Sequence, residues 1–134
     1  MDLSDIRFIN RDPGSGTRLW LDAELKHLKM DPKQIKGYDQ IVKTHNGSAS
    51  MIEAGQADVG LSLQAAAYQH HLDFIPLFEE RYDLVLPREN ERLILPLLDY
   101  LQTAAFRNEL NSLTGYNSTH SGEQIPLGRT LNET

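Results

Sequence analysis

Apolar positions along the first two thirds of the chain switch between two spacings. Residues 6–10 alternate and contain β-prone side chains, which predicts a strand. After a turn-forming Asp-Pro-Gly-Ser-Gly run, Leu21, Leu25 and Leu28 recur at helical spacing and predict a helix over residues 17–29. The chain therefore opens with a strand, a glycine-bearing loop and a helix.

The same alternation continues to Pro87. A helix that ends near Ala54 is predicted first, with Asn46 or Ser48 as its N-terminal cap. An Ala-rich run then predicts a helix over residues 63–70. The further predicted strands cover residues 35–38, 40–43, 57–61, 74–78 and 82–86. Strands that alternate with helices favour an α/β fold with a mixed, mostly parallel sheet.

The C-terminal third is predicted to be helical and then irregular. Residues 92–102 and 104–113 carry leucines at helical spacing, and Thr103 can cap the second helix. Pro96 fits only in a first helical turn, so the first of these helices is expected to begin near Leu95. The polar residues 117–134 are expected to form a loosely packed tail.

Composition narrows the classes of function. The 134-residue chain has a net charge of -6, which argues against direct contact with nucleic acid. It has no cysteine, so disulfides, thiolate metal sites and a cysteine nucleophile are excluded, and a cytoplasmic location is expected. No apolar run approaches the roughly 18 residues of a membrane span, so no membrane partner is expected.

The loop after the first strand can carry chemistry. Gly14 and Gly16 permit a tight turn, and the following helix start offers backbone N–H groups to an anion. Arg11 adds a charged donor, and Ser15 and Thr17 add hydroxyl groups. The alternative is that Ser15 or Thr17 only caps the helix. The loop is not a P-loop, because the Gly-Lys-Ser/Thr ending is absent.

A longer ordered set of motifs resembles a known family. Phe8-Ile-Asn-Arg-Asp-Pro-Gly-Ser-Gly-Thr-Arg18 resembles the start of the second lobe in type II periplasmic binding proteins for oxyanions. The chain over residues 6–116 is similar to the binding-protein-like domain of ModE-type DNA-binding regulators or MoeA-type molybdopterin-biosynthesis proteins. The further motifs in order are Gly37-Tyr38, Thr44-His45, Glu53-Ala-Gly-Gln-Ala-Asp-Val-Gly60, Leu72-Asp-Phe-Ile-Pro-Leu77, Tyr82-Asp-Leu-Val-Leu86 and Leu113-Thr-Gly-Tyr116.

The resemblance implies that this chain forms one lobe of a two-lobed binding protein plus part of the other lobe. Residues 1–62 would form a second-lobe segment with the Gly-Ser-Gly-Thr anion loop, and residues 63–116 would return to the first lobe with strands and C-terminal helices. The polar tail would be residues 117–134. The family's first-lobe segment before the opening strand is missing here, so exposed sheet edges could pair with another copy of the chain.

The resemblance also implies a function. We expect a non-enzymatic domain, without metal or cofactor, that binds a small anion such as molybdate or tungstate and belongs to a longer transcriptional regulator or transport-related protein. A DNA-binding domain would then lie elsewhere in that longer protein. The expected ligand-binding residues are Arg11, Ser15, Gly16, Thr17, His45, Asn46, Ser48 and Tyr82.

Several alternatives stay open at this point. The domain could serve molybdenum-cofactor biosynthesis, or act as a LysR-type effector domain for a small carboxylate. His45, Asn46 and Ser48 could merely begin a helix, and Tyr82 could be a core residue. Phosphate binders of this kind carry an acid where Pro13 stands, which favours a fully ionised oxyanion, although Asp12 is adjacent.

Overall fold

The structure is a computed structural model that describes residues 5–123. It divides into two compact units, Met1–Leu77 and Phe78–Thr134, which we describe separately as the first and second units. The elements of the first unit are β1 (Phe8–Arg11), α1 (Gly16–His27), the 3₁₀ turn η2 (Pro32–Gln34), β2 (Ile41–Val42), α2 (His45–Glu53), β3 (Val59–Gly60) and α3 (Gln64–Gln69). The second unit contains η3 (Arg88–Ile94), α4 (Leu95–Leu101) and α5 (Ala104–Ser112).

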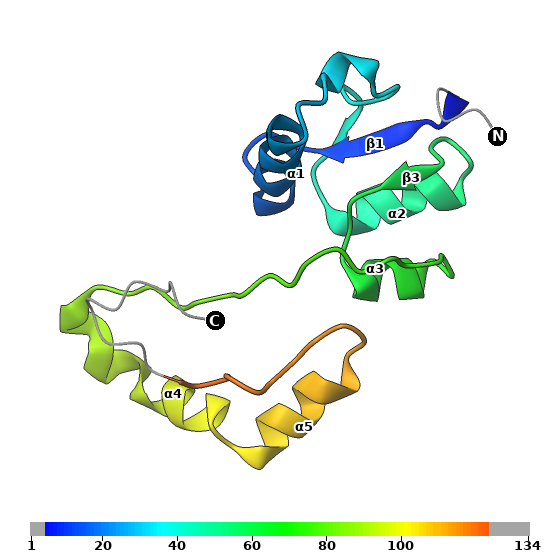
Figure 1. The fold of residues 1–134 in the computed structure, drawn as a ribbon. Helices are drawn as coiled ribbons and strands as arrows, with labels where there is room; N and C mark the ends of the chain where they lie inside the picture. The colour runs from blue at the N-terminus through cyan, green and yellow to red at the C-terminus, as the bar shows by residue number, and fades with distance from the viewer. Residues whose placement is uncertain (1–4, 124–134) are drawn as a thin grey trace. The chain divides into compact units, whose positions relative to one another are not determined.

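The first unit is built on a three-stranded parallel sheet in the order β2-β1-β3 (Figure 1). Asn10 lies opposite Ile41 on one side of β1, and Phe8 lies opposite Val59 on the other. The predicted α/β architecture with parallel strands is therefore confirmed. The chain leaves β1 through α1 toward β2 and returns through α2 to β3, so the direction of winding reverses at β1. In open α/β sheets, ligands bind beyond the carboxyl ends of strands at such a reversal.

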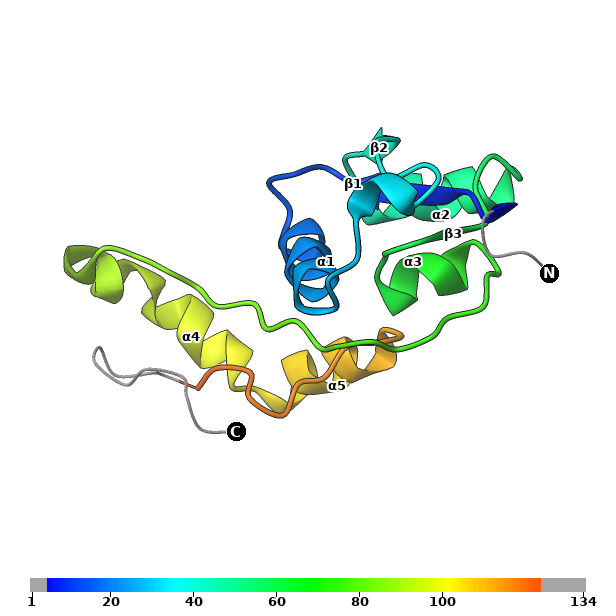
Figure 2. The same cartoon turned by 45° about the horizontal axis from the view of Figure 1, so that its top comes forward.

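Both faces of β1 are buried. Ile9 is 1% exposed and Asn10 is 0% exposed, and successive strand residues point to opposite faces. The side chains of Ile9 and of Ser48 on α2 both lie close to Gly60. A Cβ added at Gly60 would be 2.6 Å from each of them. The side-chain amide of Asn10 donates to the carbonyl of Tyr38 at 3.0 Å. β1 is thus covered on each side, and its neighbouring strands and helices are visible from a second direction in Figure 2.

The start of α2 differs from the prediction. Its N-cap is Thr44, whose hydroxyl accepts a hydrogen bond from the N–H of Gly47 at 2.9 Å. Asn46 and Ser48 were predicted as caps, but the helix begins at His45, so both lie inside its first turn. A cap needs extended backbone before the helix, and Thr44 has that conformation.

Three predicted strands are wrong. Residues 35–38 form a turn after η2, in which Tyr38 N–H donates to the carbonyl of Ile35 and Gly37 has a φ of 92°. Residues 74–78 and 82–86 are neither strand nor helix. Their composition suits a strand, but a strand forms only beside a hydrogen-bonding partner, and no described strand pairs with either segment.

The helices of the second unit follow the prediction more closely. α4 begins at Leu95, as predicted, with Pro96 in its first turn where a missing N–H is tolerated. Thr103 caps α5 by accepting from the N–H of Phe106, and the rings of Tyr100 and Phe106 meet edge to face at 5.5 Å.

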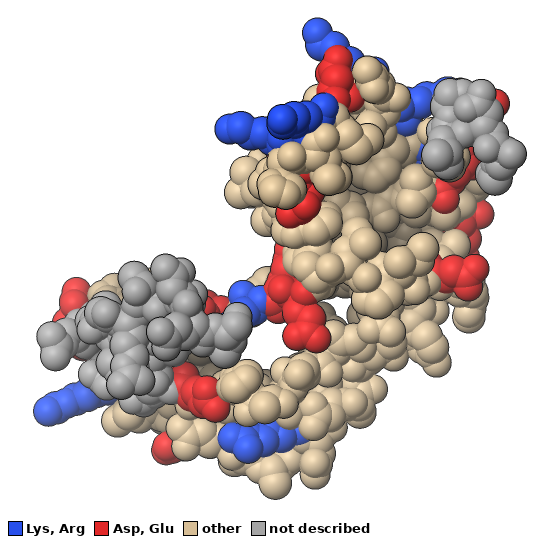
Figure 3. Space-filling model, viewed as in Figure 1, with Lys and Arg blue, Asp and Glu red and all other residues tan. Residues whose placement is uncertain are grey.

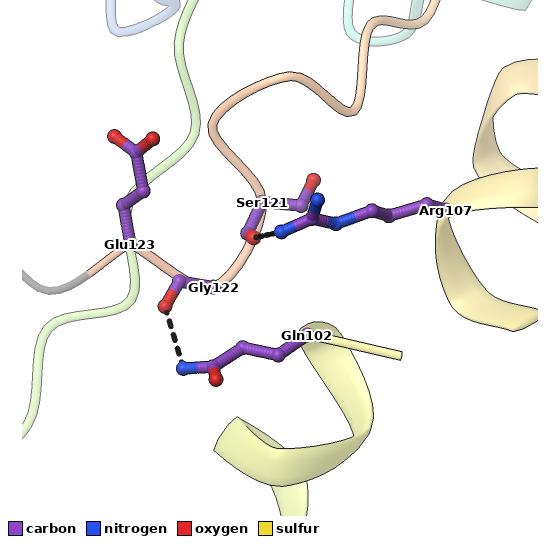
Figure 4. A pocket seen from close by; sticks show the side chains of 5 residues that line it. All are labelled: Gln102, Arg107, Ser121, Gly122 and Glu123. Carbon is purple, nitrogen blue, oxygen red and sulfur yellow. Dashed lines mark hydrogen bonds between the residues drawn. The ribbon is translucent and has the colours of Figure 1, made fainter. Parts of the chain in front are cut away.

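Part of the expected loose tail is instead ordered. Residues 119–122 form turns, and Ser118 is buried. Gln102 donates to the carbonyl of Gly122 at 3.1 Å, and Arg107 reaches the carbonyl of Ser121, around a small depression also lined by Glu123 (Figure 4). The remainder of the predicted tail, residues 124–134, lies outside the described residues.

The turn before β2 should depend on glycine at position 37. A side chain there would place Cβ 2.1 Å from the carbonyl oxygen of Phe8, in a backbone conformation with φ of 92°. Gly55 has a φ of 67°, but a Cβ there meets nothing within 4 Å. Gly55→Ala should therefore cost only the left-handed backbone penalty of about 1–2 kcal/mol, whereas Gly37→Ala should cost more. Denaturant unfolding followed by the fluorescence of Trp20, the single tryptophan, measures both in the first unit. Equal losses would contradict the clash.

An ion pair ties the start of β1 to β3. Arg7 donates to both carboxylate oxygens of Asp58, at 3.0 and 2.7 Å, and its backbone N–H donates at 2.8 Å. These hydrogen bonds lower the pKa of Asp58 from 3.8 to about 2. A lowered pKa stabilises the folded protein above pH 3.8, and that contribution disappears as the pH falls through about 2.

Asp58→Asn should therefore lower the thermal midpoint at pH 7, and the difference from the unmodified protein should vanish near pH 2. Trp20 fluorescence recorded against pH checks this. Asp73→Asn, which removes an exposed carboxylate outside this pair, is the matched control. A midpoint difference between the Asp58→Asn variant and the unmodified protein that stays constant down to pH 2 would argue against the role of the ion pair.

Candidate functional site

The loop that follows β1 is held in place by Ser15. The N–H and hydroxyl of Ser15 both donate to the carbonyl of Asp12, at 3.0 and 2.9 Å. The same hydroxyl oxygen accepts from the N–H of Arg18 at 3.3 Å, so Ser15 is the N-cap of α1. The capping alternative raised for Ser15 is thus realised, and the cap fixes the start of α1 directly beyond the end of β1.

Arg11 joins the two predicted loops. It is the last residue of β1, and its side chain is 8% exposed. Its Nη1 lies 2.8 Å from Nδ1 of His45, the first residue of α2, and its Nη2 donates to the carbonyl of Lys43 at 3.1 Å. Because a guanidinium only donates, Nδ1 of His45 accepts, which places the imidazole proton on Nε2. Arg11 and His45, predicted separately from the sequence, are in direct contact.

Within residues 5–123, Arg11 keeps an unused hydrogen-bond donor and only a long ion pair. Its nearest carboxylate oxygen is that of Asp12, 3.7 Å from Nη2, which is longer than a hydrogen bond. Its Nε is buried and has no hydrogen-bond partner within the described part of the chain. Buried cations are normally paired and their donors satisfied, because an uncompensated buried charge is costly. The arrangement can therefore accept an anion.

A second buried arginine supports this edge of the sheet. Arg18 donates to the carbonyl of Arg11 at 3.1 Å, and its guanidinium lies 4.3 Å from the ring centroid of Tyr38. Asp22 accepts from Nε of Arg18 at 2.9 Å and from the hydroxyl of Tyr38. Burial alone would lower the pKa of Arg18, but the hydrogen bonds to Asp22 and Tyr38 raise it. The cluster keeps Arg18 charged and holds α1 against the end of β1.

Sequence reasoning did not assign this role to Arg18. In the sequence, Arg18 stands out only as the last residue of the motif that begins at Phe8. The available signal was the spacing of Arg18 and Asp22, four residues apart on a predicted helix, where opposite charges meet. Tyr38 is distant in sequence, so no local pattern predicts its contact with Arg18.

The other predicted site residues fall into different environments. Gly16 and Thr17 open α1, the first exposed and the second buried. Asn46 is exposed in the first turn of α2, next to His45. Ser48 is 0% exposed, and its hydroxyl has no hydrogen-bond partner in the described region. Tyr82 belongs to the second unit and is 76% exposed, so it is not the core residue that the alternative proposed.

Other kinds of site find little support in the described residues. No group of three His, Asp or Glu side chains there could hold a metal ion, and His70 contacts Glu53 at 2.7 Å. Lys and Arg occur in small separate groups among Asp and Glu on the face drawn in Figure 3. Within residues 5–123, no helix has both the length and the apolar character needed to cross a membrane.

The first unit is thus a small α/β domain built on a three-stranded parallel sheet. The chain belongs to the periplasmic-binding-protein-like family, because residues 1–102 match the PBP superfamily domain. Membership agrees with a binding domain that is not an enzyme.

Two relatives are similar over most of this chain. Uncharacterized protein YvgK of Bacillus subtilis (strain 168) is 40% identical over 122 residues, which are 91% of this chain and 40% of that protein. An uncharacterized protein in the ferredoxin 2Fe-2S gene 5'region of Clostridium pasteurianum is 34% identical over 108 residues, 78% of this chain and 96% of that protein. The chain thus spans less than half the length of the Bacillus protein. No solved structure matches the chain significantly.

Two serines of the site should respond oppositely to alanine. Ser48→Ala removes a buried hydroxyl that has no hydrogen-bond partner among residues 5–123, so stability should stay constant or rise by up to about 1 kcal/mol. Ser15→Ala removes a helix cap and should cost about 1 kcal/mol. Denaturant unfolding followed by Trp20 fluorescence measures both. If Ser48→Ala destabilised the first unit as much as Ser15→Ala, Ser48 would have a partner that this structure does not describe.

Proposed function

We propose that this chain is the ligand-binding part of a sensor for a small oxyanion of the molybdate or tungstate type. The observation that carries the proposal is Arg11, a buried guanidinium. Within residues 5–123 its Nε has no hydrogen-bond partner, and its nearest carboxylate oxygen, that of Asp12, lies 3.7 Å away, beyond hydrogen-bonding distance. An anion at the carboxyl ends of β1 and β2 would supply an acceptor for this donor and a second negative charge.

The surroundings of Arg11 suit such a ligand. α1 and α2 both begin at this edge of the sheet, and the first turn of a helix presents N–H groups and a positive dipole end to an anion. Gly16 and Thr17 would contribute from the first loop, and His45 and Asn46 from the second. Ser15 would act mainly by fixing the loop, since its hydroxyl is already engaged.

The preference among oxyanions depends on whether the anion carries a proton that the site has to bind. Pro13 offers no acceptor for the proton of hydrogen phosphate, which favours fully ionised anions such as molybdate, tungstate and sulfate. Asp12 opposes this preference to some extent, because its carboxylate lies 3.7 Å from Arg11 and could accept a hydrogen bond from a protonated anion. The anions tested therefore have to include both fully ionised oxyanions and phosphate, which carries a proton.

We further propose that the domain works within a longer, cytoplasmic two-lobed protein, with this sheet as part of the second lobe. Anion binding would close the lobes, and an attached domain, such as the DNA-binding part of a ModE-type regulator, would respond to that closure. The match to only 40% of the Bacillus relative supports a longer protein of this kind.

Thermal unfolding with added anions tests the oxyanion site. Molybdate, tungstate, sulfate and phosphate are compared at constant ionic strength, and at least one should raise the midpoint. A ligand at 100 times its dissociation constant stabilises by about 2.7 kcal/mol. Arg11→Ala should abolish the shift, because it removes the central donor.

Arg7→Ala is the matched control, since Arg7 precedes β1 at the opposite end of the strand and pairs with Asp58. It should lower the starting midpoint and keep the shift caused by the anion. If no anion raises the midpoint, or if Arg11→Ala responds like the unmodified chain, an oxyanion is not the ligand of this site.

A further inference from the structure

The contact between Arg11 and His45 requires a neutral imidazole. Nη1 of Arg11 lies 2.8 Å from Nδ1 of His45, and a guanidinium has only N–H groups to offer. Nδ1 therefore accepts the hydrogen bond, which it can do only while it carries no proton. A proton on Nδ1 would set two donors and two positive charges against each other. Because histidine changes its charge between about pH 5 and 8, this contact depends on pH.

The backbone of His45 is held in place independently of its ring. His45 is the first residue of α2, and the helix start is capped by Thr44, whose hydroxyl accepts from the N–H of Gly47. The carbonyl of His45 accepts a hydrogen bond from the hydroxyl of Ser62 at 3.0 Å. A protonated imidazole would therefore remain close to the guanidinium of Arg11, where the two positive charges repel each other.

We propose that His45 makes anion binding at Arg11 depend on pH, with tighter binding at lower pH. This inference rests on the proposed anion site. As the anion binds, Nδ1 of His45 takes a proton from the solvent and the hydrogen bond from Nη1 of Arg11 to Nδ1 breaks. The anion then lies between the imidazolium and the guanidinium, so a doubly charged oxyanion meets two cations in place of one.

The direction of the pH dependence follows from the charges. In the free site, a proton on His45 faces the positive charge of Arg11, so protonation is disfavoured. With a doubly negative anion between the two side chains, each positive charge has a partner, so protonation is favoured. Whatever makes protonation of the occupied site easier also makes anion binding to the protonated site tighter, by the same factor. The affinity should therefore rise as the pH falls through the range in which histidine takes up a proton.

The other charged groups near His45 ordinarily keep their charge in this range. Arg11 lies at the end of β1, and Arg18 of α1 donates to its carbonyl. Asp12 follows β1, and Lys43 lies exposed before α2. The other elements that contact α2 are β2, β3 and α3, whose sequences contain no charged residue. Arginine, lysine and carboxylate side chains ordinarily titrate outside pH 6 to 8. Among these groups, His45 is therefore the one that changes its charge.

Isothermal titration calorimetry of the whole chain tests the coupling. Molybdate and sulfate are titrated at pH 6 and pH 8 at constant ionic strength. Both anions keep a double charge over this range, so a change in affinity comes from the protein. The affinity should be about fivefold or more higher at pH 6 than at pH 8. Titrations at pH 6 in two buffers of different ionisation enthalpy should show that protons are taken up from the buffer.

Variants of His45 identify the group that responds. His45→Asn keeps an oxygen that can accept from Arg11 but takes up no proton, so the ratio of its affinities at pH 6 and pH 8 should fall to about one. His45→Leu offers no acceptor and should bind more weakly than His45→Asn at pH 8. His27→Asn makes the same chemical change at the exposed last residue of α1 and should keep the ratio of the unmodified chain.

The outcomes separate the coupling from the anion site itself. Tighter binding at pH 6 that is lost in His45→Asn, together with proton uptake by the unmodified chain, supports the coupling. If an anion binds equally at both pH values, or if folded His45→Asn keeps the ratio of the unmodified chain, the coupling is wrong and the anion site stands. If neither anion binds at pH 6 or pH 8, the site at Arg11 does not take doubly charged oxyanions and the coupling fails with it. Circular dichroism checks that each variant is folded, and the proton uptake of the unmodified chain decides the question if His45→Asn is not.

Discussion

The buried guanidinium of Arg11 is the constraint on which the rest of the first unit depends. A fixed positive charge at the end of the central strand has to be surrounded by acceptors, and the chain provides the carbonyl of Lys43 and the ring of His45. Both come from the stretch between β2 and α2, so the arginine joins the ends of two neighbouring strands. Asp12 forms only a long ion pair with it, at 3.7 Å, and its Nε has no hydrogen-bond partner in the part of the chain that the structure describes, so one buried donor stays unused.

The contacts of Arg18 explain how the loop between β1 and α1 keeps its conformation beside the buried charge of Arg11. Arg18 donates a hydrogen bond to the carbonyl of Arg11, lies over the ring of Tyr38 and forms an ion pair with Asp22. These contacts fix α1 to the turn before β2. Gly37 makes that turn possible, because its conformation and the nearby Phe8 carbonyl exclude a side chain. An anion would thus meet a loop that is already organised, which reduces the ordering needed on binding.

Much of the fold followed from local patterns. The strand at residues 6–10, the helix after Gly-Ser-Gly-Thr and the helix starting at Leu95 were correct because apolar spacing, turn residues and proline act within a few residues. The strands predicted over residues 74–78 and 82–86 were wrong because β-prone composition does not supply a partner. The cap of α2 was misplaced by two to four residues for a similar reason: Thr44, Asn46 and Ser48 are all capable caps, and packing decides which one lies at the helix end.

The sequence by itself determined the α/β class, the loop from Arg11 to Thr17 and the residues that could serve an anion. These features depend on side-chain spacing and on the backbone preferences of glycine and proline. Only the tertiary structure decided that Arg11 meets His45, that Tyr38 completes the Arg18 cluster and that Ser48 is buried beside Gly60. Those contacts join residues 12 to 34 positions apart, and such pairs are brought together by the order of strands in the sheet, which no local pattern encodes.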